Sequence, residues 1–305
     1  KRHQIALNAG FENFRDYQHS AMHRYDYTPA DCSIFHQAIE DVVVPLRRRL
    51  ENERASELGV DPIRPWDSAV DVKGRSPLRP FETADELIEG SSRIFNKMDP
   101  QLGGFFDSLR EGDCLDLATR QGKAPGGYQY NRDFSRKPFI FMNAAGRHRD
   151  LETMVHEAGH AFHSCLSDHD PLVSYRHSPI EFAEVASMSM ELLTYPYLDE
   201  FYDEEASNRA RREHLEAMAV TLSWIAQVDA FQHWIYLNPT HTREQRRAEW
   251  LALDERFGGA YSWTGFEDAH EHLWHRQLHI FGIPFYYIEY GIAQLGALQV
   301  WLNSK

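Results

Sequence analysis

Residues 154–163 read MVHEAGHAFH and contain the pattern H-E-x-x-H within a segment of helical periodicity. On a helix, side chains four residues apart differ by about 40° in direction and by about 6 Å along the axis. His156 and His160 can therefore reach one metal ion together, while Glu157 projects beside them. We interpret Glu157 as a residue that acts on a metal-activated water and not as a ligand. We expect this helix to cover residues 150–166, with Asp150 as its N-cap.

A catalytic zinc site needs a third protein ligand and an open coordination position. One common arrangement places a third His six residues after the second, but Leu166 occupies that position here. A carboxylate on a following helix is the other common solution. The predicted helix 180–193 offers Glu181 and Glu184, and spacing alone does not choose between them. Glu191 follows Glu184 by seven residues and is expected on the same face, either as a surface acid or as an acceptor for the N–H of a ligand imidazole.

The segments around this motif predict a mainly helical protein with a small β-sheet. Residues 128–130 and 138–142 are short, aromatic and strand-like, and a turn-rich loop precedes them. We expect them to pair as a hairpin. Elsewhere, apolar residues recur at helical spacing between turn signals. The other predicted helices cover, approximately, 29–58 (with Thr28 as N-cap, a kink at Pro45 and a stop at Gly59), 84–97, a stretch after Pro100, 202–236, 242–258, 266–279 and 284–302.

Composition narrows the class of protein. The chain has 305 residues, of which 42% are hydrophobic and 26% charged, as is typical of a folded globular protein. We find no domain boundary and treat 1–305 as a single helical region. The net charge of −14 argues against a nucleic-acid partner, and no apolar run approaches the ~20 residues that span a bilayer. Three widely spaced cysteines indicate a reducing compartment, so we expect a cytoplasmic protein. The chain begins without Met and stops in a helix-like run, and we expect it to be cut at both ends.

The motif residues resemble the M3 family of zinc oligopeptidases. That family shows the pattern H-E-x-G-H-x-x-H followed by [DE]-F-x-E-x-x-S-x-x-x-E, which this chain matches at residues 156–163 and 181–191. The second acid of the F-x-E piece is the third zinc ligand of the family. The resemblance therefore implies one Zn²⁺ per chain, held by His156, His160 and Glu184.

A second block of sequence, in the C-terminal part of the chain, also resembles this family. Residues 284–291 read PFYYIEYG and are similar to the tyrosine-rich helix of the oligoendopeptidase F branch, in which a His precedes the tyrosines, here His279. The resemblance implies that Tyr290, with Tyr286 or His279, donates a hydrogen bond to the oxyanion. Aromatic packing is the alternative. We expect Tyr286 and Tyr290 to share a helix face and Tyr287 to lie off it.

Zinc peptidases of this type also bind peptides along a strand edge beside the metal helix. By this resemblance, Gly126, Gly127 and Tyr128 become candidate substrate-binding residues, because glycine permits close approach of a backbone. An ordinary hairpin turn explains the same residues equally well.

These observations predict a mainly α, zincin-like metallopeptidase catalytic domain with a small β-sheet beside the H-E-x-x-H helix. We expect it to be an endopeptidase that hydrolyses short peptides with a zinc-activated water. Two alternatives remain open. One is a related zinc carboxypeptidase that uses the same site, and the other is a non-catalytic chain that binds zinc or peptide. Neither a membrane nor a nucleic acid is expected as a partner, and the oligomeric state is not predicted.

Overall fold

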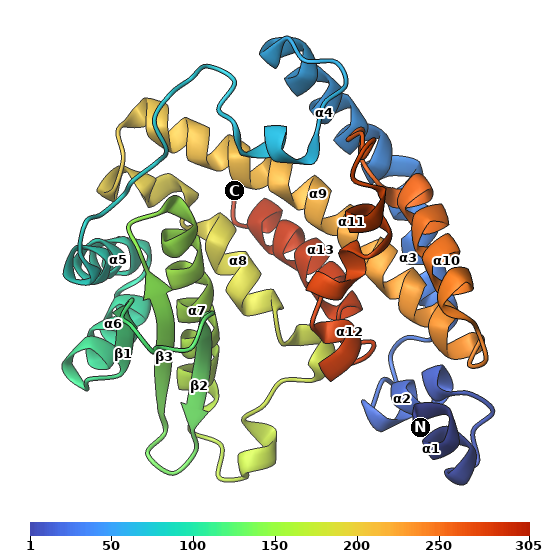
Figure 1. The fold of residues 1–305 in the computed structure, drawn as a ribbon. Helices are drawn as coiled ribbons and strands as arrows, with labels where there is room; N and C mark the ends of the chain where they lie inside the picture. Colours follow the sequence, from blue (N-terminus) through green and yellow to red (C-terminus); the bar gives the residue numbers. More distant parts are fainter. The chain divides into compact units, whose positions relative to one another are not determined.

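The computed structural model describes residues 1–305, which form two compact units. Unit 1 comprises Lys1–Arg75 and Leu215–Gly291, and unit 2 comprises Ser76–His214 and Ile292–Lys305. Two helices contribute residues to both units, α9 and α13, which span Glu204–Leu237 and Ile288–Asn303. Each unit is described by itself below (Figure 1).

Unit 2 contains a three-stranded sheet in the order β1-β3-β2. The strands are β1 (Leu115–Ala118), β2 (Tyr128–Arg132) and β3 (Lys137–Ala144). β2 and β3 form the expected antiparallel hairpin, with Tyr130 opposite Phe139. β1 runs parallel to β3 on its other edge and was not expected, because four residues without clear alternation give no strand pattern. Along β3 every second side chain is buried, so one face of this strand belongs to the core.

Helix α7 (His148–Ser167) carries the H-E-x-x-H motif and packs beside the sheet (Figure 1). Our prediction that Asp150 is its N-cap is wrong, because Arg147 holds that position and Asp150 is the third helical residue. The Asp150 carboxylate accepts hydrogen bonds from the backbone N–H groups of Ala145 and Arg147, at 2.7 and 2.9 Å. A carboxylate in the first turn of the helix therefore accepts hydrogen bonds from backbone N–H groups that precede the helix. The mainly helical class and the small sheet beside the motif helix are both confirmed.

The remaining helices of unit 2 include α5 (Ala84–Met98), α6 (Pro100–Glu111) and α8 (Val185–Leu193). We predicted a single helix over 180–193, and that is wrong. A 3₁₀ helix, Ile180–Phe182, comes first, and Glu184 is then the N-cap of α8, with φ −103° and ψ −1°. Glu181 and Glu184 therefore do not lie on one helix. The relative direction of their side chains cannot be predicted from helical spacing.

Unit 1 is built from helices around a core of large aromatic side chains. The capping of Thr28 by Asp31 and the left-handed Gly59, φ +66°, begin and end the helical stretch as predicted. A π-helical segment, Ile39–Val43, stands just before Pro45, where we expected a kink. The helices of unit 1, besides its share of α9 and α13, are α1 (Arg2–Asn8), α2 (Phe14–Ala21), α3 (Pro29–Ala38), α4 (Val44–Leu58), α10 (Arg243–Phe257), α11 (Glu267–Glu271) and α12 (His279–Gly282).

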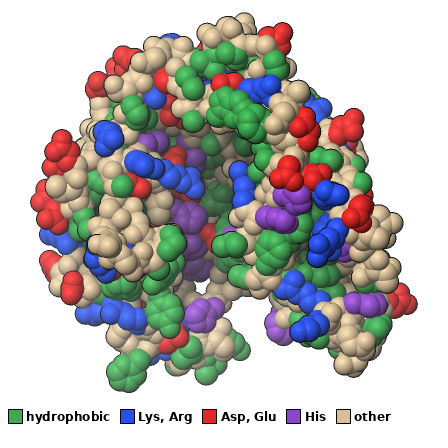
Figure 2. All heavy atoms as spheres, viewed as in Figure 1, with side chains coloured by type: hydrophobic (Ala, Val, Ile, Leu, Met, Phe, Trp, Pro, Cys, Tyr) green, Lys and Arg blue, Asp and Glu red, His purple; other side chains and the backbone are tan.

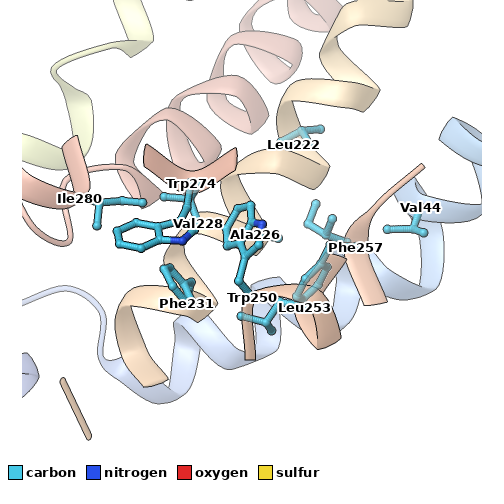
Figure 3. Packing of buried hydrophobic residues seen from close by; sticks show 11 residues of the cluster. Val44, Leu222, Ala226, Val228, Phe231, Trp250, Leu253, Phe257, Trp274 and Ile280 are labelled. Carbon is cyan, nitrogen blue, oxygen red and sulfur yellow. The ribbon is translucent and has the colours of Figure 1, made fainter. Parts of the chain in front are cut away.

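The core of unit 1 lies where α9 meets α10 and the segment that follows it. The Trp250 ring contacts Phe231 edge-on, with ring centroids 5.1 Å apart, and Phe231 in turn contacts Trp274 at 5.4 Å (Figure 3). Aromatic rings in edge-to-face contact stabilise the fold by more than the burial of their apolar surface alone. These aromatic contacts hold α9 against α10, and α9 also carries Asp229 and His233.

Two further predicted helices, one in unit 1 and one that contributes residues to both units, differ from the structure. The stretch 266–279 is not one helix but three short pieces, namely α11, the 3₁₀ helix Leu273–Arg276 and α12. The stretch 284–302 becomes helical only at Ile288, because Phe285 adopts a left-handed conformation, φ +67°. Tyr286 consequently precedes α13, and helical spacing does not relate it to Tyr290.

None of the helices of either unit is both long and apolar enough to cross a membrane. On the face shown in Figure 2, Lys and Arg side chains are scattered among Asp and Glu side chains and do not gather into one basic patch.

Candidate metal centre

Three potential metal ligands meet in unit 2, two from α7 and one from the N-cap of α8. Nε2 of His156 and Nε2 of His160 lie 3.3 and 3.2 Å from the same oxygen of Glu184, Oε2. One ligand atom from each residue lies within 4.8 Å of the other two. The side chains of both histidines remain about one-fifth exposed, at 22% and 21%, so the cluster is open on one side. The structure thus brings Glu184, rather than Glu181, to the two histidines.

Gly159 makes this convergence possible. A Cβ atom at position 159 would lie 2.6 Å from Cα of Ser187 and 2.8 Å from the carbonyl oxygen of Ala186. A Cβ atom essentially never comes within 3.0 Å of a non-bonded heavy atom, so only glycine lets α7 approach the first turn of α8 this closely. Ser187 also fixes the ligand itself, since its hydroxyl donates to the carbonyl oxygen of Glu184 and lies 3.2 Å from Oε2.

The electrostatics of the cluster suit a cation. Burial by itself would lower the pKa of His156, but the carboxylates of Glu184 and Glu191 raise that pKa to about 10. Burial would raise the pKa of Glu184, yet the two imidazoles hold it well below its ordinary value. Two imidazole nitrogens and a carboxylate oxygen therefore converge at a place with the negative charge that a divalent ion needs. Two nitrogens and one carboxylate oxygen are a common ligand set of catalytic zinc, so these residues fit that ion.

Glu157 follows His156 on α7, and its carboxyl group lies close enough to the ligand cluster to interact with the charges of His156, His160 and Glu184. Its side chain is buried, and burial raises the pKa of its carboxyl group above the ordinary value. The positive charge on His156 and His160 opposes that rise, as does a hydrogen bond with the backbone of Gln129 in β2. A carboxylate with a raised pKa is a better proton acceptor near neutral pH than an ordinary glutamate.

A chain of side chains extends from His156 away from the cluster. Nδ1 of His156 lies 2.6 Å from Oε1 of Glu191, and Oε2 of Glu191 lies 2.9 Å from Nε2 of His214. Nδ1 of His214 then lies 2.7 Å from the hydroxyl of Tyr195. Glu191 stands where we expected an acceptor for a ligand imidazole. His214 and Tyr195 are not predicted from the sequence, because neither has a fixed spacing from the motif that would single it out.

The loop before β2 has structural reasons for its glycines. Gly126 has φ +101°, a conformation that favours glycine, and a Cβ atom on Gly127 would lie 2.9 Å from Cγ2 of Thr153 in α7. Asn143 holds the loop by donating to the carbonyl oxygens of Ala124 and Gly126. The ring of Tyr128 stacks on Phe141, with 4.9 Å between ring centroids. β2 nevertheless remains an edge strand, since it pairs with β3 alone.

The C-terminal tyrosines and His279 form a cluster in unit 1. Nε2 of His279 lies 3.4 Å from the hydroxyl of Tyr290, and the rings of Tyr286 and Tyr290 are 5.5 Å apart. We expected Tyr286 and Tyr290 to share a helix face and Tyr287 to lie off it, but Tyr286 and Tyr287 both precede α13, and Tyr287 contacts the same group. Its ring lies 5.3 Å from Tyr290 and 5.2 Å from His279, because the chain before Ile288 is not helical.

A helix whose H-E-x-x-H histidines converge with a glutamate from the next helix defines the metal site of one class of metallopeptidases. Comparison with known proteins gives the family. The model of peptidase family M3 matches residues 1–305, and the chain belongs to this family.

The relatives that the chain resembles are oligopeptidases. Group B oligopeptidase PepB of Streptococcus agalactiae is 24% identical over 258 residues, which cover 82% of this chain and 41% of that protein. Chromosomal oligoendopeptidase F of Lactococcus lactis subsp. cremoris is 31% identical over 123 residues, 40% of this chain and 20% of that protein. The structure of PZ peptidase A with inhibitor 2 matches with a TM-score of 0.93 and 32% identity, over 99% of this chain and 54% of that one. The chain thus spans about half the length of these relatives or less.

Proposed function

We propose that this chain provides the catalytic centre of a zinc-dependent endopeptidase that hydrolyses short peptides. The convergence of His156, His160 and Glu184 beside a buried Glu157 carries the proposal. One Zn²⁺ per chain would be held at this centre by those two imidazoles and that carboxylate. The zincin-like character of the fold belongs to the same proposal, and so does a cytoplasmic location, which three unpaired cysteines support.

When bound, zinc would polarise the scissile carbonyl group and lower the pKa of the attacking water. The residues of the chain then move the proton. A carboxylate oxygen of Glu157 accepts the proton from the attacking water and later delivers it to the nitrogen of the leaving amine. Burial supports this role, because it raises the pKa of Glu157 towards the range in which a carboxylate exchanges protons readily. Glu191 keeps the ring of His156 oriented meanwhile.

We assign two further roles within this proposal. The hydroxyl of Tyr290, with Tyr286 or His279 beside it, would donate to the oxyanion of the tetrahedral intermediate. The exposed edge of β2 would bind the peptide backbone, with Gly126, Gly127 and Tyr128 at its beginning. An unpaired strand edge supports the second role, since its backbone groups can bind peptides of varied sequence.

The proposal is tested with zinc-loaded protein and internally quenched peptides whose two ends are blocked. Hydrolysis of these peptides is the expected result, and Glu157→Gln should keep its zinc while kcat falls by several orders of magnitude. Glu152→Gln on the same helix is the matched control and should retain activity. Cleavage only of peptides with a free C-terminus would instead indicate a carboxypeptidase. Zinc binding without cleavage of either kind would leave the non-catalytic alternative.

A further inference from the structure

Unit 1 contains a second cluster of metal-ligating side chains, separate from the centre in unit 2. His19 from α2, Cys32 from α3 and His233 from α9 each offer one ligand atom, and these atoms lie within 4.8 Å of one another. All three residues are buried, with 6%, 2% and 8% of their surface exposed. Polar groups buried this deeply need partners, because the loss of water is costly.

The cluster is built from two pairs at helical spacing. Cys32 and His36 are four residues apart on α3, and Asp229 and His233 are four apart on α9, so each pair occupies one helix face. The two faces meet where Nε2 of His36 lies 2.9 Å from Oδ2 of Asp229. The ring of His19 joins from α2, with its centroid 6.0 Å from that of His233.

Some buried polar atoms of this cluster form no hydrogen bond within the protein. Three of its buried atoms have no hydrogen-bond partner, namely Nδ1 of His19, Oδ1 of Asp229 and Nε2 of His233. The last of these lies 3.3 Å from Oδ2 of Asp229 without forming a hydrogen bond. Several unsatisfied polar atoms at one buried place are rare in folded proteins and point to an ion or a water that completes them.

We propose that His19, Cys32 and His233 bind a second divalent metal ion, of the zinc type. Two imidazoles and one thiolate are ligands of intermediate to soft character, which suits Zn²⁺ and disfavours Mg²⁺ or Ca²⁺. Asp229, whose Oδ2 lies 3.3 Å from Nε2 of His233, supplies negative charge beside this imidazole. The ion would join α2, α3 and α9 and so act as a structural element of unit 1.

Charges of both signs lie at the cluster. The Arg24 guanidinium is positive, and its Nη1 lies 3.4 Å from Nε2 of His19. Arg24 is itself paired with the buried Glu289 through two hydrogen bonds to Oε1. Asp229 is fully buried and supplies negative charge beside His36 and His233. Burial and Asp229 hold the pKa of the Cys32 thiol well above its ordinary value, so metal binding must release that proton.

Cobalt distinguishes the two centres, because only the second one contains sulfur. Apo-protein is titrated with Co²⁺, both after folding and with Co²⁺ present during refolding, and the near-ultraviolet thiolate-to-cobalt charge-transfer band is measured. We expect this band at one Co²⁺ per chain, in addition to the ion bound in unit 2. Cys32→Ser should abolish the band, whereas Cys165→Ser and Glu184→Ala should leave it unchanged. Total cobalt should fall from two to one per chain in Cys32→Ser and likewise in Glu184→Ala.

Absence of the band from the wild-type protein under both conditions would overturn the proposal, whatever the variants do. So would a band that survives in Cys32→Ser and disappears in Cys165→Ser, because a different thiol would then bind the cobalt. His19→Gln is a second variant that keeps the thiol, and we expect it to weaken and shift the band. None of these measurements depends on peptidase activity.

Discussion

Glu191 accepts a 2.6 Å hydrogen bond from Nδ1 of His156 in unit 2. This contact leaves Nε2 of the same ring as the atom that faces Glu184, 3.3 Å away. A histidine ligand whose second nitrogen donates to a carboxylate is fixed in tautomer and orientation, and is a stronger ligand for that reason. His214 steadies Glu191 from its other oxygen, at 2.9 Å.

Glu191→Gln should therefore weaken zinc binding in unit 2 without removing a ligand. Substitutions of such supporting carboxylates typically cost about 10–100-fold in metal affinity. Competition with a chelator measures the change, and Glu89→Gln, an exposed position on α5, is the control. An unchanged affinity in Glu191→Gln would show that the contact with His156 does not support the metal.

The zinc content of two variants distinguishes the two candidate third ligands, Glu184 and Glu181. Glu184→Ala should lose the zinc of unit 2, because it removes one of three converging ligands. Glu181→Ala should retain it, since Glu181 does not belong to the cluster. Elemental analysis of the purified variants decides between them, and the reverse outcome would move the ligand assignment from the N-cap of α8 to the 3₁₀ helix before it.

Gly159→Ala should destabilise the protein and disturb the metal centre at once. The added methyl group would meet the backbone at Ser187, which cannot move without shifting α8 and Glu184. Overpacking of this kind costs about 1–3 kcal/mol in the free energy of unfolding. Denaturant unfolding and chelator competition measure the two effects.

Gly104→Ala on α6 is the matched control for this change. Nothing lies within 4 Å of a Cβ atom built there, and its backbone is helical. We expect a gain of about 0.5–1 kcal/mol, because alanine favours the helix more than glycine does. A tolerated Gly159→Ala would contradict the close approach of α7 to α8.

Tyr290→Phe distinguishes oxyanion stabilisation from aromatic packing. The change keeps the ring and removes the hydroxyl that lies 3.4 Å from His279. If the hydroxyl donates to the oxyanion, kcat should fall by roughly 10²–10³ while KM changes little. Tyr287→Phe in the same cluster is the control and should leave kcat unchanged. Unaltered kinetics in Tyr290→Phe would assign that ring to packing.

Much of the fold could be predicted from local sequence. The hairpin of β2 and β3, the start of α3 at Thr28 and the left-handed stop at Gly59 follow from side-chain periodicity and capping chemistry. These signals act over a few residues, so the sequence contains them fully. β1 and the breaks near 183 and 285 were missed, because long-range pairing and a left-handed Phe285 override local preference there.

The same division applies to the site. Local sequence is enough to predict that His156 and His160 point the same way, because backbone hydrogen bonds within one helix set the direction of residues four apart. Spacing did not choose between Glu181 and Glu184, and the packing of α7 against α8 brings Glu184 to the two imidazoles. Glu184 reaches the imidazoles because α8 begins at that residue and because Gly159 lets the two helices touch. The contact of His214 with Glu191 was likewise decided by packing between segments distant in the chain, for which local spacing supplies no constraint.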